Sequence, residues 1–506
     1  MANTIMMQGT SSHVGKSILT TALCRIFLQD GRKVVPFKAQ NMALNSYVTK
    51  TGEEMGRAQV AQAEAAGLEP MVEMNPVLLK PTGNSSSQVI LMGKSVGNMS
   101  AKEYHMGYSL KALGVIKECL DKLNTEFDTI VIEGAGSPAE VNLKANDIVN
   151  MRIAKMLSAP VVLIADIDRG GALASVVGTL ELLEADERAL IKGIIINKFR
   201  GDLDLLKPAL DFLEAKTGKP IIGVVPHLDQ LGIDDEDSVS LDDKQIGITR
   251  ELTIAVIRTP KIANFTDFDA LASEVDVTIH YVRPGEEIGK PDLIILPGSK
   301  NTIDDLLYLR QHGYEQEITN LVNAGTPLIG ICGGYQMLGQ QIYDPAHTES
   351  ELDSIVGIGL LDIATTFIAG KVTHQVTATC SPNGFLGIDI SCDDLTGYEI
   401  HMGRTDFLSP VKHAFTITSR SSQMTNWDDG VISSNGRIMG TYIHGIFDND
   451  RYRRSLLNAL RVAKGLEPID AINDTYTRKQ NSYNRLADTV RKSLNMELIY
   501  QMMGTK

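Results

Sequence analysis

The chain has 506 residues, and 48 Lys and Arg against 62 Asp and Glu give it a formal net charge of −14. Its 43% hydrophobic and 22% charged residues are an ordinary globular composition, which excludes a wholly disordered chain. The acidic balance argues against a nucleic-acid partner, and no segment has the pattern of a membrane span or an export signal.

The first 230 residues alternate between apolar runs of strand length and helical patterns. The runs are nearly continuous, which is typical of parallel strands that are buried on both faces. We therefore predict an α/β domain over residues 1–230 with an open, mainly parallel sheet. Its predicted strands are residues 4–7, 34–37, 129–132, 161–165, 193–196 and 221–225, with helices at 17–29 and 57–66.

A glycine-rich loop that contains Gly9, Thr10, Gly15, Lys16 and Ser17 follows the first strand and precedes a helix. Such glycines let backbone amides converge on a phosphate, and the start of the helix favours negative charge. The lysine can reach the outer phosphates, and the serine hydroxyl can bind Mg²⁺. Five residues separate the glycines instead of the usual four, but the order of strand, loop and helix favours a nucleotide site over a chance glycine turn.

The longer loop resembles that of the dethiobiotin-synthetase-like P-loop enzymes, which use ATP to activate a carboxylate for attack by a nitrogen nucleophile. This resemblance implies that Glu133, at the end of a buried strand, binds Mg²⁺, although such a carboxylate can also cap a helix. It also implies a second phosphate-side lysine at Lys38 and an adenine-recognising residue at Asn197, which could equally be a polar strand end. A charged cluster at residues 166–171 follows another strand, at the edge where ligands gather in open α/β sheets.

The composition changes at residues 231–250, where acidic runs predict a solvated linker. A second α/β pattern follows, and we assign residues 251–450 to a second domain and residues 451–506 to a helical segment. The predicted strands are 252–257, 277–281, 293–296 and 327–331, and the predicted helices are 303–322, 451–464 and an amphipathic tail from residue 470.

The five cysteines are scattered without a Cys-x-x-Cys pair, which predicts neither a disulfide framework nor a zinc site and favours a cytoplasmic location. Cys332 alone lies between glycines, in a pattern typical of a strained turn that exposes a nucleophile. The helix that follows favours the thiolate, and the amides of Gly333 and Gly298 could stabilise an oxyanion. His444, just beyond a β segment, is the predicted general base, although one of ten histidines can fall there by chance.

These residues resemble a triad-type, class I glutamine amidotransferase domain, which hydrolyses glutamine through a thioester and releases ammonia. Most members have a glutamate two residues after the histidine, where this chain has Ile446. The branch that acts on corrinoids also lacks this glutamate. Glu399 is our candidate for the residue that orients His444 instead.

The two resemblances span nearly the whole chain and together are similar to the corrinoid amide synthases. They imply ATP, Mg²⁺ and glutamine, and amidation of the b, d, e and g carboxylates of adenosylcobyrinate a,c-diamide. Two alternatives are cobyrinate a,c-diamide synthase and a P-loop regulatory ATPase with an inactive amidotransferase-like domain. The phosphate loop lacks the extra lysine of such ATPases, and Cys332 and His444 are both present, which argues against the regulatory ATPase. The two amide synthases differ in the carboxylates that react, and we favour the one that amidates b, d, e and g. The oligomeric state and the order of the amidations stay open.

Overall fold

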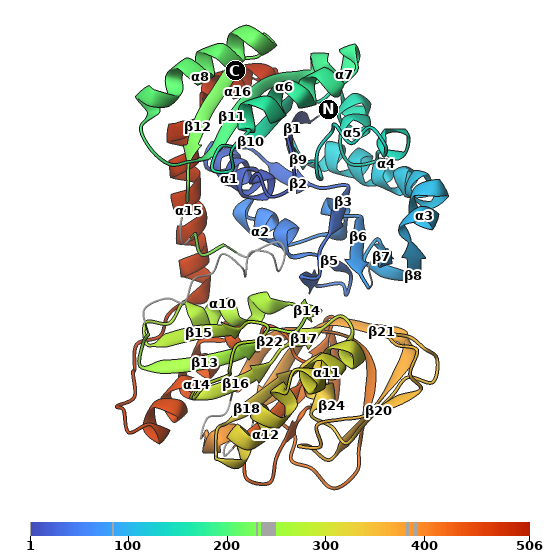
Figure 1. Cartoon of the computed structure of the whole chain (residues 1–506), viewed down its shortest axis with the longest axis vertical. Coiled ribbons are helices and arrows are strands. Elements are labelled where there is room, and N and C mark those ends of the chain that lie inside the picture. The colour runs from blue at the N-terminus through green and yellow to red at the C-terminus, as the bar shows by residue number, and fades with distance from the viewer. Residues whose placement is uncertain are drawn as a thin grey trace. The chain divides into compact units, whose positions relative to one another are not determined.

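The structure is a computed structural model that describes residues 2–82, 85–228, 231–233, 249–380, 384–388 and 392–505. Its contacts divide the chain into two compact units (Figure 1). The first unit comprises Met1–Met42, Met55–Ile233 and Lys479–Lys506, and the second comprises Ala43–Glu54 and Asp234–Arg478. Each unit therefore includes a segment that lies far from the rest of it in the sequence. The acidic runs of the predicted linker fall outside the described residues.

A six-stranded parallel sheet in the order β12-β11-β10-β1-β9-β2 forms the centre of the first unit. The six predicted strands are all present, and β9 and β10 are buried along their whole length, which accounts for their continuous apolar runs. The strands are β1 (Asn3–Gly9), β2 (Val34–Phe37), β9 (Thr129–Glu133), β10 (Val161–Asp166), β11 (Ile191–Phe199) and β12 (Ile221–Pro226).

Helices and a small sheet fill the connections between these strands. The small sheet has the order β3-β6-β7-β8 and lies between β2 and β9 in the sequence. Its strands are β3 (Gln40–Met42), β6 (Val77–Pro81), β7 (Ser86–Leu91) and β8 (Lys94–Ser100). The principal helices are α1 (Lys16–Gln29), α2 (Arg57–Ala65), α4 (Ser109–Glu126), α5 (Met151–Leu157), α6 (Ala172–Leu182), α7 (Ala185–Leu190) and α8 (Leu203–Thr217). No helix in the described ranges is both long and apolar enough to cross a membrane.

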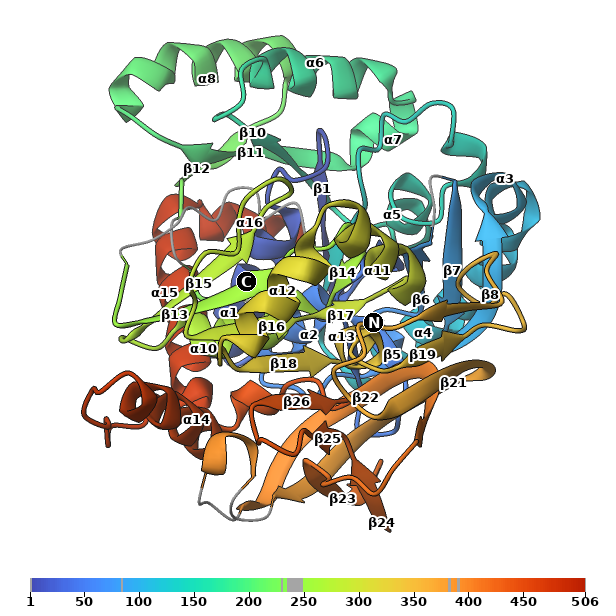
Figure 2. The same cartoon turned by 60° about the horizontal axis from the view of Figure 1, so that its bottom comes forward.

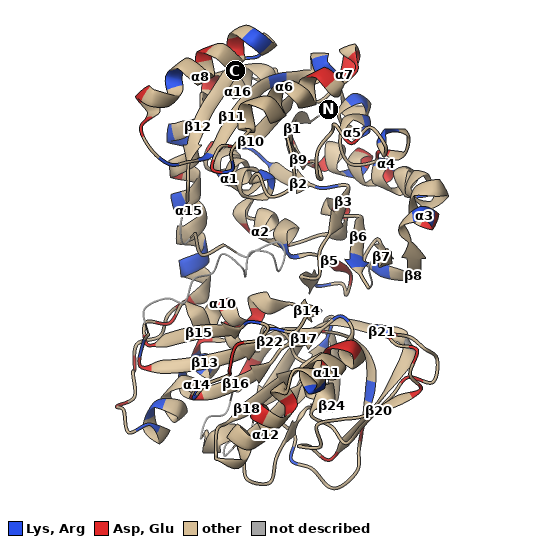
Figure 3. Ribbon diagram, in the orientation of Figure 1, with Lys and Arg blue, Asp and Glu red and all other residues tan. Residues whose placement is uncertain are grey.

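The carboxyl-terminal tail returns to the first unit as two helices, α15 (Thr475–Ser493) and α16 (Met496–Met502). The apolar face of α15 packs into the core that also contains Leu23 and Phe27 of α1. Figure 3 shows Lys and Arg at several positions along α15. Arg491 of this helix pairs with Asp30 at 2.9 Å. The predicted amphipathic tail is confirmed, but it is interrupted at Asn495, whose side chain accepts from the backbone of α16.

The second unit contains a six-stranded sheet in the order β15-β13-β16-β18-β26-β25, in which only β25 runs antiparallel to its neighbour. A second sheet is built around two long antiparallel strands, β21 (Ile363–Cys380) and β22 (Cys392–Phe407), which run side by side in Figures 1 and 2. The strands of the first of these sheets are β13 (Leu252–Ile257), β15 (Val277–Val282), β16 (Leu293–Leu296), β18 (Leu328–Ile331), β25 (Val431–Ile432) and β26 (Ile438–Thr441). The second sheet also contains β19 (Gln341–Tyr343), β20 (Ser354–Val356), β23 (Phe415–Arg420) and β24 (Gln423–Asp429).

The single helix predicted over residues 303–322 is instead two helices, α11 (Thr302–Gln311) and α12 (Tyr314–Asn323). Gly313 separates them with a φ of 80°, in the left-handed region that interrupts a right-handed helix. The break lets the buried side chain of Tyr314 donate to the carbonyl oxygens of Arg283 and Glu286, each at 2.9 Å. Tertiary hydrogen bonds therefore outweigh the helical periodicity here.

Candidate active sites

The glycine-rich loop connects β1 to α1 at the carboxyl edge of the parallel sheet in the first unit. Gly15 precedes the helix with a φ of 97°, which favours glycine. Gly9 allows a close approach, because a Cβ there would lie 2.5 Å from Cγ2 of Val14. The amide of Thr10 donates to the carbonyl of Ile164 at 2.9 Å and ties the loop to the neighbouring strand β10. The loop is thus held in one shape by its own glycines and by the sheet.

Lys16 folds back over this loop. Its ammonium group donates to the carbonyl oxygens of Ser11 at 2.9 Å and Gly136 at 3.1 Å. The side chain is almost fully buried, so the positive charge is held beside the backbone amides at the start of α1. This arrangement of one lysine and a helix N-terminus is suited to binding the phosphates of a nucleotide.

Glu133, at the end of β9, is the centre of a buried cluster in the same unit. Its Oε1 accepts from the hydroxyl of Ser17 and from Nζ of Lys38, each at 2.8 Å, and its Oε2 accepts from Nε2 of Gln62 at 2.5 Å. The structure therefore brings the predicted residues of this site together and adds Gln62 from α2. Mg²⁺ in nucleotide sites usually binds one or two protein oxygens together with phosphate oxygens and water. Ser17 and Glu133 supply a hydroxyl and a carboxylate oxygen of this kind side by side.

Asn197 and the charged cluster after β10 lie at the same sheet edge. The side-chain amide of Asn197 donates to the carbonyl of Val14 at 2.7 Å and supports the phosphate loop. Asp166 pairs with Lys198 at 2.9 Å, so the carboxyl ends of β10 and β11 are cross-linked by charge. Recognition of adenine by Asn197 stays a prediction.

Cys332 lies in a strained turn between β18 and the short helix α13 (Gly333–Met337) of the second unit. Its φ of 51° and ψ of −106° are unusual for a side-chain-bearing residue. The turn depends on glycine, because a Cβ on Gly334 would lie 2.1 Å from the carbonyl oxygen of Leu296. The amide of Cys332 donates to Thr441 of β26 at 2.8 Å, and its sulfur lies 3.6 Å from the carbonyl oxygen of Ile400. This geometry is that of a nucleophile elbow.

The imidazole of His444 is fixed by contacts on three sides. Its Nδ1 lies 2.6 Å from Oδ2 of Asp267, and the other oxygen of that carboxylate accepts from the amide of Gly445 at 3.0 Å. Its ring stacks on Tyr398 with 5.2 Å between centroids and 17° between planes. Its Nε2 lies 3.4 Å from Nδ2 of Asn264. The ring is buried and therefore has one defined orientation.

The electrostatics of this site favour a charged imidazole. Burial by itself lowers the pKa of His444, but the carboxylate of Asp267 and a hydrogen bond with Cys332 together raise that pKa to about 10. The site thus has a triad arrangement in which nucleophile, base and carboxylate contact one another in turn, as Cys332, His444 and Asp267. The imidazolium is the charge state of His444 that these neighbours stabilise.

The two glycines predicted to line an oxyanion hole lie beside these groups. Gly333 directly follows Cys332 and begins α13. Gly298 begins the short strand β17 (Gly298–Ser299), and a Cβ on it would lie 3.0 Å from Cε1 of His444. A side chain would not fit at Gly333 either, because a Cβ there would lie 2.8 Å from the amide nitrogen of Ser299. Donation from these two amides to an oxyanion stays a prediction.

Glu399 does not orient His444, so that prediction is wrong. Its carboxylate accepts two hydrogen bonds of 2.7 and 2.8 Å from the guanidinium of Arg420. Burial raises the pKa of Glu399, but the neighbouring His401 and Arg420 together hold that pKa below its usual value. The side chain that contacts Nδ1 of His444 is Asp267.

Comparisons with known proteins agree with this division of the chain. Residues 5–239 match the CobQ/CobB/MinD/ParA nucleotide binding domain, and residues 253–452 match the CobB/CobQ-like glutamine amidotransferase domain. A cobyric acid synthase from Pelotomaculum thermopropionicum is 54% identical over 100% of this chain and 97% of its own length. Those of Desulforamulus reducens and Moorella thermoacetica are 52% and 54% identical, each over 100% of this chain and 98% of the relative. The chain belongs to the cobyric acid synthase family.

The carboxylate that contacts the imidazole of His444 was not predicted from the sequence of this cobyric acid synthase family member. Asp267 lies 177 residues before His444, in the turn Phe265–Phe268 that follows strand β14 (Ile262–Ala263). A local signal for it exists, because polar residues shortly after an apolar strand often line a site. That signal does not say which histidine the carboxylate meets, since β14 and β26 belong to different sheets and only the tertiary fold brings their ends together.

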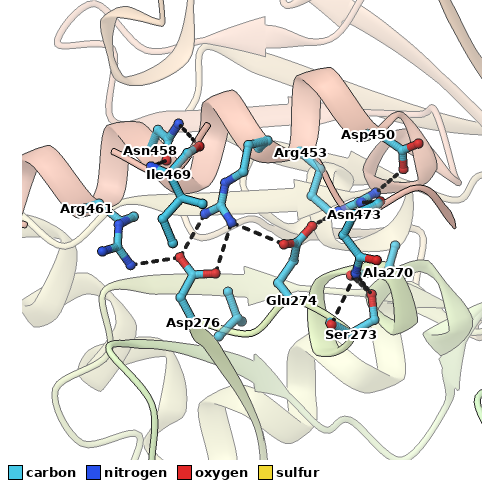
Figure 4. A network of polar contacts seen from close by, with 12 residues as sticks. Ala270, Ser273, Glu274, Asp276, Asp450, Arg453, Asn458, Arg461, Ile469 and Asn473 are labelled. Atoms are coloured by element: carbon cyan, nitrogen blue, oxygen red, sulfur yellow. Dashed lines mark hydrogen bonds and ion pairs between the residues drawn. The ribbon is translucent and has the colours of Figure 1, made fainter. Parts of the chain in front are cut away.

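A buried ionic network anchors the helix that follows His444 in this cobyric acid synthase family member (Figure 4). Asp276 accepts from Arg454 at 2.8 and 3.0 Å and from Arg461 at 3.0 Å, both on α14 (Asp450–Ala463). Glu274 accepts from Arg453 at 2.6 Å, and Arg453 also donates to the carbonyl of Asn473 at 2.6 Å. The network ties α14 to the loop before β15 and to the segment that leads into α15.

Proposed function

We propose that the chain catalyses the ATP- and glutamine-dependent amidation of the b, d, e and g carboxylates of adenosylcobyrinate a,c-diamide, which yields adenosylcobyrate. The observation that carries this proposal is the presence of two complete sites on one chain. The first unit has a phosphate loop beside Glu133, and the second has Cys332, His444 and Asp267 in contact. The names of the full-length relatives support the choice of a corrinoid substrate.

The second unit releases ammonia from glutamine in this proposal. The thiolate of Cys332 attacks the amide carbon of glutamine, and the amides of Gly333 and Gly298 donate to the oxyanion that forms. His444 gives its Nε2 proton to the departing ammonia, while Asp267 stabilises the imidazolium from the Nδ1 side. The imidazole then takes a proton from water, which hydrolyses the thioester to glutamate and regenerates the thiolate.

The first unit activates the substrate carboxylate. Lys16 and the amides of the glycine-rich loop bind the phosphates of ATP, and Lys38 adds a second positive charge. Ser17 and Glu133 would hold Mg²⁺, which neutralises phosphate charge when it is bound. A carboxylate oxygen of the corrinoid attacks the γ-phosphorus of ATP, the bond from that phosphorus to the bridging oxygen breaks, and ADP leaves. Ammonia then attacks the carbonyl carbon of the acyl phosphate, loses a proton and displaces inorganic phosphate to form the amide. The scattered cysteines, which form no Cys-x-x-Cys pair, suit a reducing cytoplasm as the location of this chemistry.

The test is the substitution Cys332→Ala, assayed with two nitrogen donors on one preparation. We expect glutamine-dependent amidation to vanish, because the thioester cannot form, and ATP-dependent amidation with ammonium at alkaline pH to survive. Alanine is smaller than cysteine, so the turn can accommodate it with little cost to folding. An unchanged ratio of the two activities would contradict the role of Cys332.

Mass spectrometry of the corrinoid product separates the proposed reaction from that of cobyrinate a,c-diamide synthase. The assay contains cobyrinate a,c-diamide, ATP, Mg²⁺ and glutamine. Each amidation replaces a hydroxyl group by an amino group, so the expected products form a series that ends with the b, d, e and g amides. If the a,c-diamide is returned unchanged while the a and c carboxylates of cobyrinate react, the sister activity is the correct one.

A further inference from the structure

A segment from the amino-terminal half of the chain is part of the glutaminase unit. Residues 43–54, here called the crossing segment, belong to the second unit, whereas the residues on either side belong to the first. The crossing segment is fastened to β21, because Gln375 donates to the carbonyl of Val48 and Thr373 donates to that of Gly52, each at 2.8 Å. Lys371 adds an ion pair with Glu54 at 2.5 Å.

One end of the crossing segment fixes the residue that faces Nε2 of His444. The amide of Ser46 donates to Oδ1 of Asn264 at 3.0 Å, and Oδ1 of Asn45 accepts from the amide of Phe265 at 3.1 Å. Asn45 and Ser46 are both fully buried. Because its oxygen accepts from Ser46, the side-chain amide of Asn264 must turn its Nδ2 toward the imidazole.

The same segment supports the aromatic ring on which His444 stacks. The hydroxyl of Tyr398 donates to the carbonyl oxygen of Ser46 at 3.2 Å. The ring of Tyr47 packs against that of Tyr398 with 5.4 Å between centroids, and Val48 joins Tyr398 in a small apolar cluster. Two of the three contacts that orient the imidazole are therefore set by residues 45–48.

We propose that the crossing segment positions His444, so that the glutaminase site is complete only with residues contributed by the amino-terminal half of the chain. By holding Asn264 and the ring of Tyr398 in place, the crossing segment keeps the imidazole in the orientation in which Nδ1 faces Asp267 and Nε2 faces Asn264. Asn45 and Ser46 touch no reacting atom in this account, and they act through Asn264 and Tyr398. The inference rests on the glutaminase activity proposed above.

The test compares three substitutions in the full chain. Asn45→Ala removes the acceptor for the amide of Phe265, and Tyr398→Phe removes only the hydroxyl that binds Ser46 while it keeps the stacked ring. Thr51→Ala is the matched control, since Thr51 is exposed in the same segment. We expect kcat for glutamine hydrolysis to fall roughly tenfold for the first two variants, the usual effect of one lost buried hydrogen bond. KM for glutamine and ammonium-dependent amidation should stay at the values of the unaltered chain.

A conservative substitution distinguishes positioning from a general loss of stability. Asn45→Asp keeps an oxygen for the amide of Phe265, so it should recover most of the kcat that Asn45→Ala loses. Wild-type kcat in both Asn45→Ala and Tyr398→Phe would overturn the inference, as would an equal loss with glutamine and with ammonium. Failure of the unaltered chain to hydrolyse glutamine would overturn the proposed function and this inference with it.

Discussion

The substitution Asp267→Asn tests the charge and the geometry of the glutaminase site together. The two carboxylate oxygens of Asp267 face two donors, Nδ1–H of His444 at 2.6 Å and the amide of Gly445 at 3.0 Å. An asparagine offers one oxygen and one NH₂ group, so one of these donors must lose its acceptor. If the NH₂ group faces the imidazole, the ring proton moves to Nε2, and His444 can no longer take a proton from the water that hydrolyses the thioester.

Either orientation of the asparagine side chain leaves a buried polar group mispaired, at a cost of about 1–3 kcal/mol. The orientation that turns the NH₂ group toward the imidazole also removes the general base. We therefore expect kcat/KM for glutamine hydrolysis to fall by about 10²-fold, measured as ammonia release. The pKa of His444, which is about 10 with the carboxylate present, should also fall, because burial lowers it and Cys332 alone then opposes that effect. Imidazolium is lost as the pH rises through this pKa, so the alkaline limb of the pH profile should move to lower pH.

The control for this experiment is Asp269→Asn, which makes the same chemical change two residues away. It should leave glutamine hydrolysis and its pH profile unaltered. Ammonium-dependent amidation should be normal in both variants, because the first unit is unchanged. If Asp267→Asn keeps the wild-type rate and the wild-type pH profile, the carboxylate is not the partner that sets the state of His444.

Three further substitutions test other parts of the molecule. Lys16→Ala should abolish amidation with glutamine and with ammonium alike, because phosphoryl transfer precedes nitrogen attack, and ammonium-dependent activity above roughly a tenth of wild type would refute its role. Glu133→Gln should raise the Mg²⁺ concentration needed for half-maximal amidation, whereas a titration curve that overlays the wild type would make Glu133 merely structural. Asp276→Asn should lower the free energy of unfolding by about 3–5 kcal/mol in denaturant titrations, because it breaks buried pairs with Arg454 and Arg461. Burial raises the pKa of Asp276, but those arginines hold that pKa below its usual value. The stability that the Asp276 carboxylate contributes is therefore present above about pH 4 and should be lost as the pH falls further. The Asp276→Asn variant should lack this pH dependence.

The phosphate site could be predicted from the sequence because its parts are short and local. Gly9, Gly15, Lys16 and Ser17 lie within nine consecutive residues, and each has a role that follows from its position between a strand and a helix. Cys332 was recognisable for the same reason, since the glycines beside it specify the strained turn. Continuous apolar runs likewise predicted the parallel strands, because burial on both faces permits few other residues.

The partners of His444 were decided by the tertiary structure. Asp267 and Asn264 reach the imidazole from one turn and Tyr398 reaches it from β22, and no spacing rule connects either element to His444. Glu399 looked suitable in the sequence, but it is buried against Arg420, a cation that comes from the neighbouring part of the same sheet. The membership of residues 43–54 in the glutaminase unit was likewise decided by the tertiary structure. Local sequence determines which groups can react, whereas the orientation of a buried side chain depends on contacts that form only when distant strands pair.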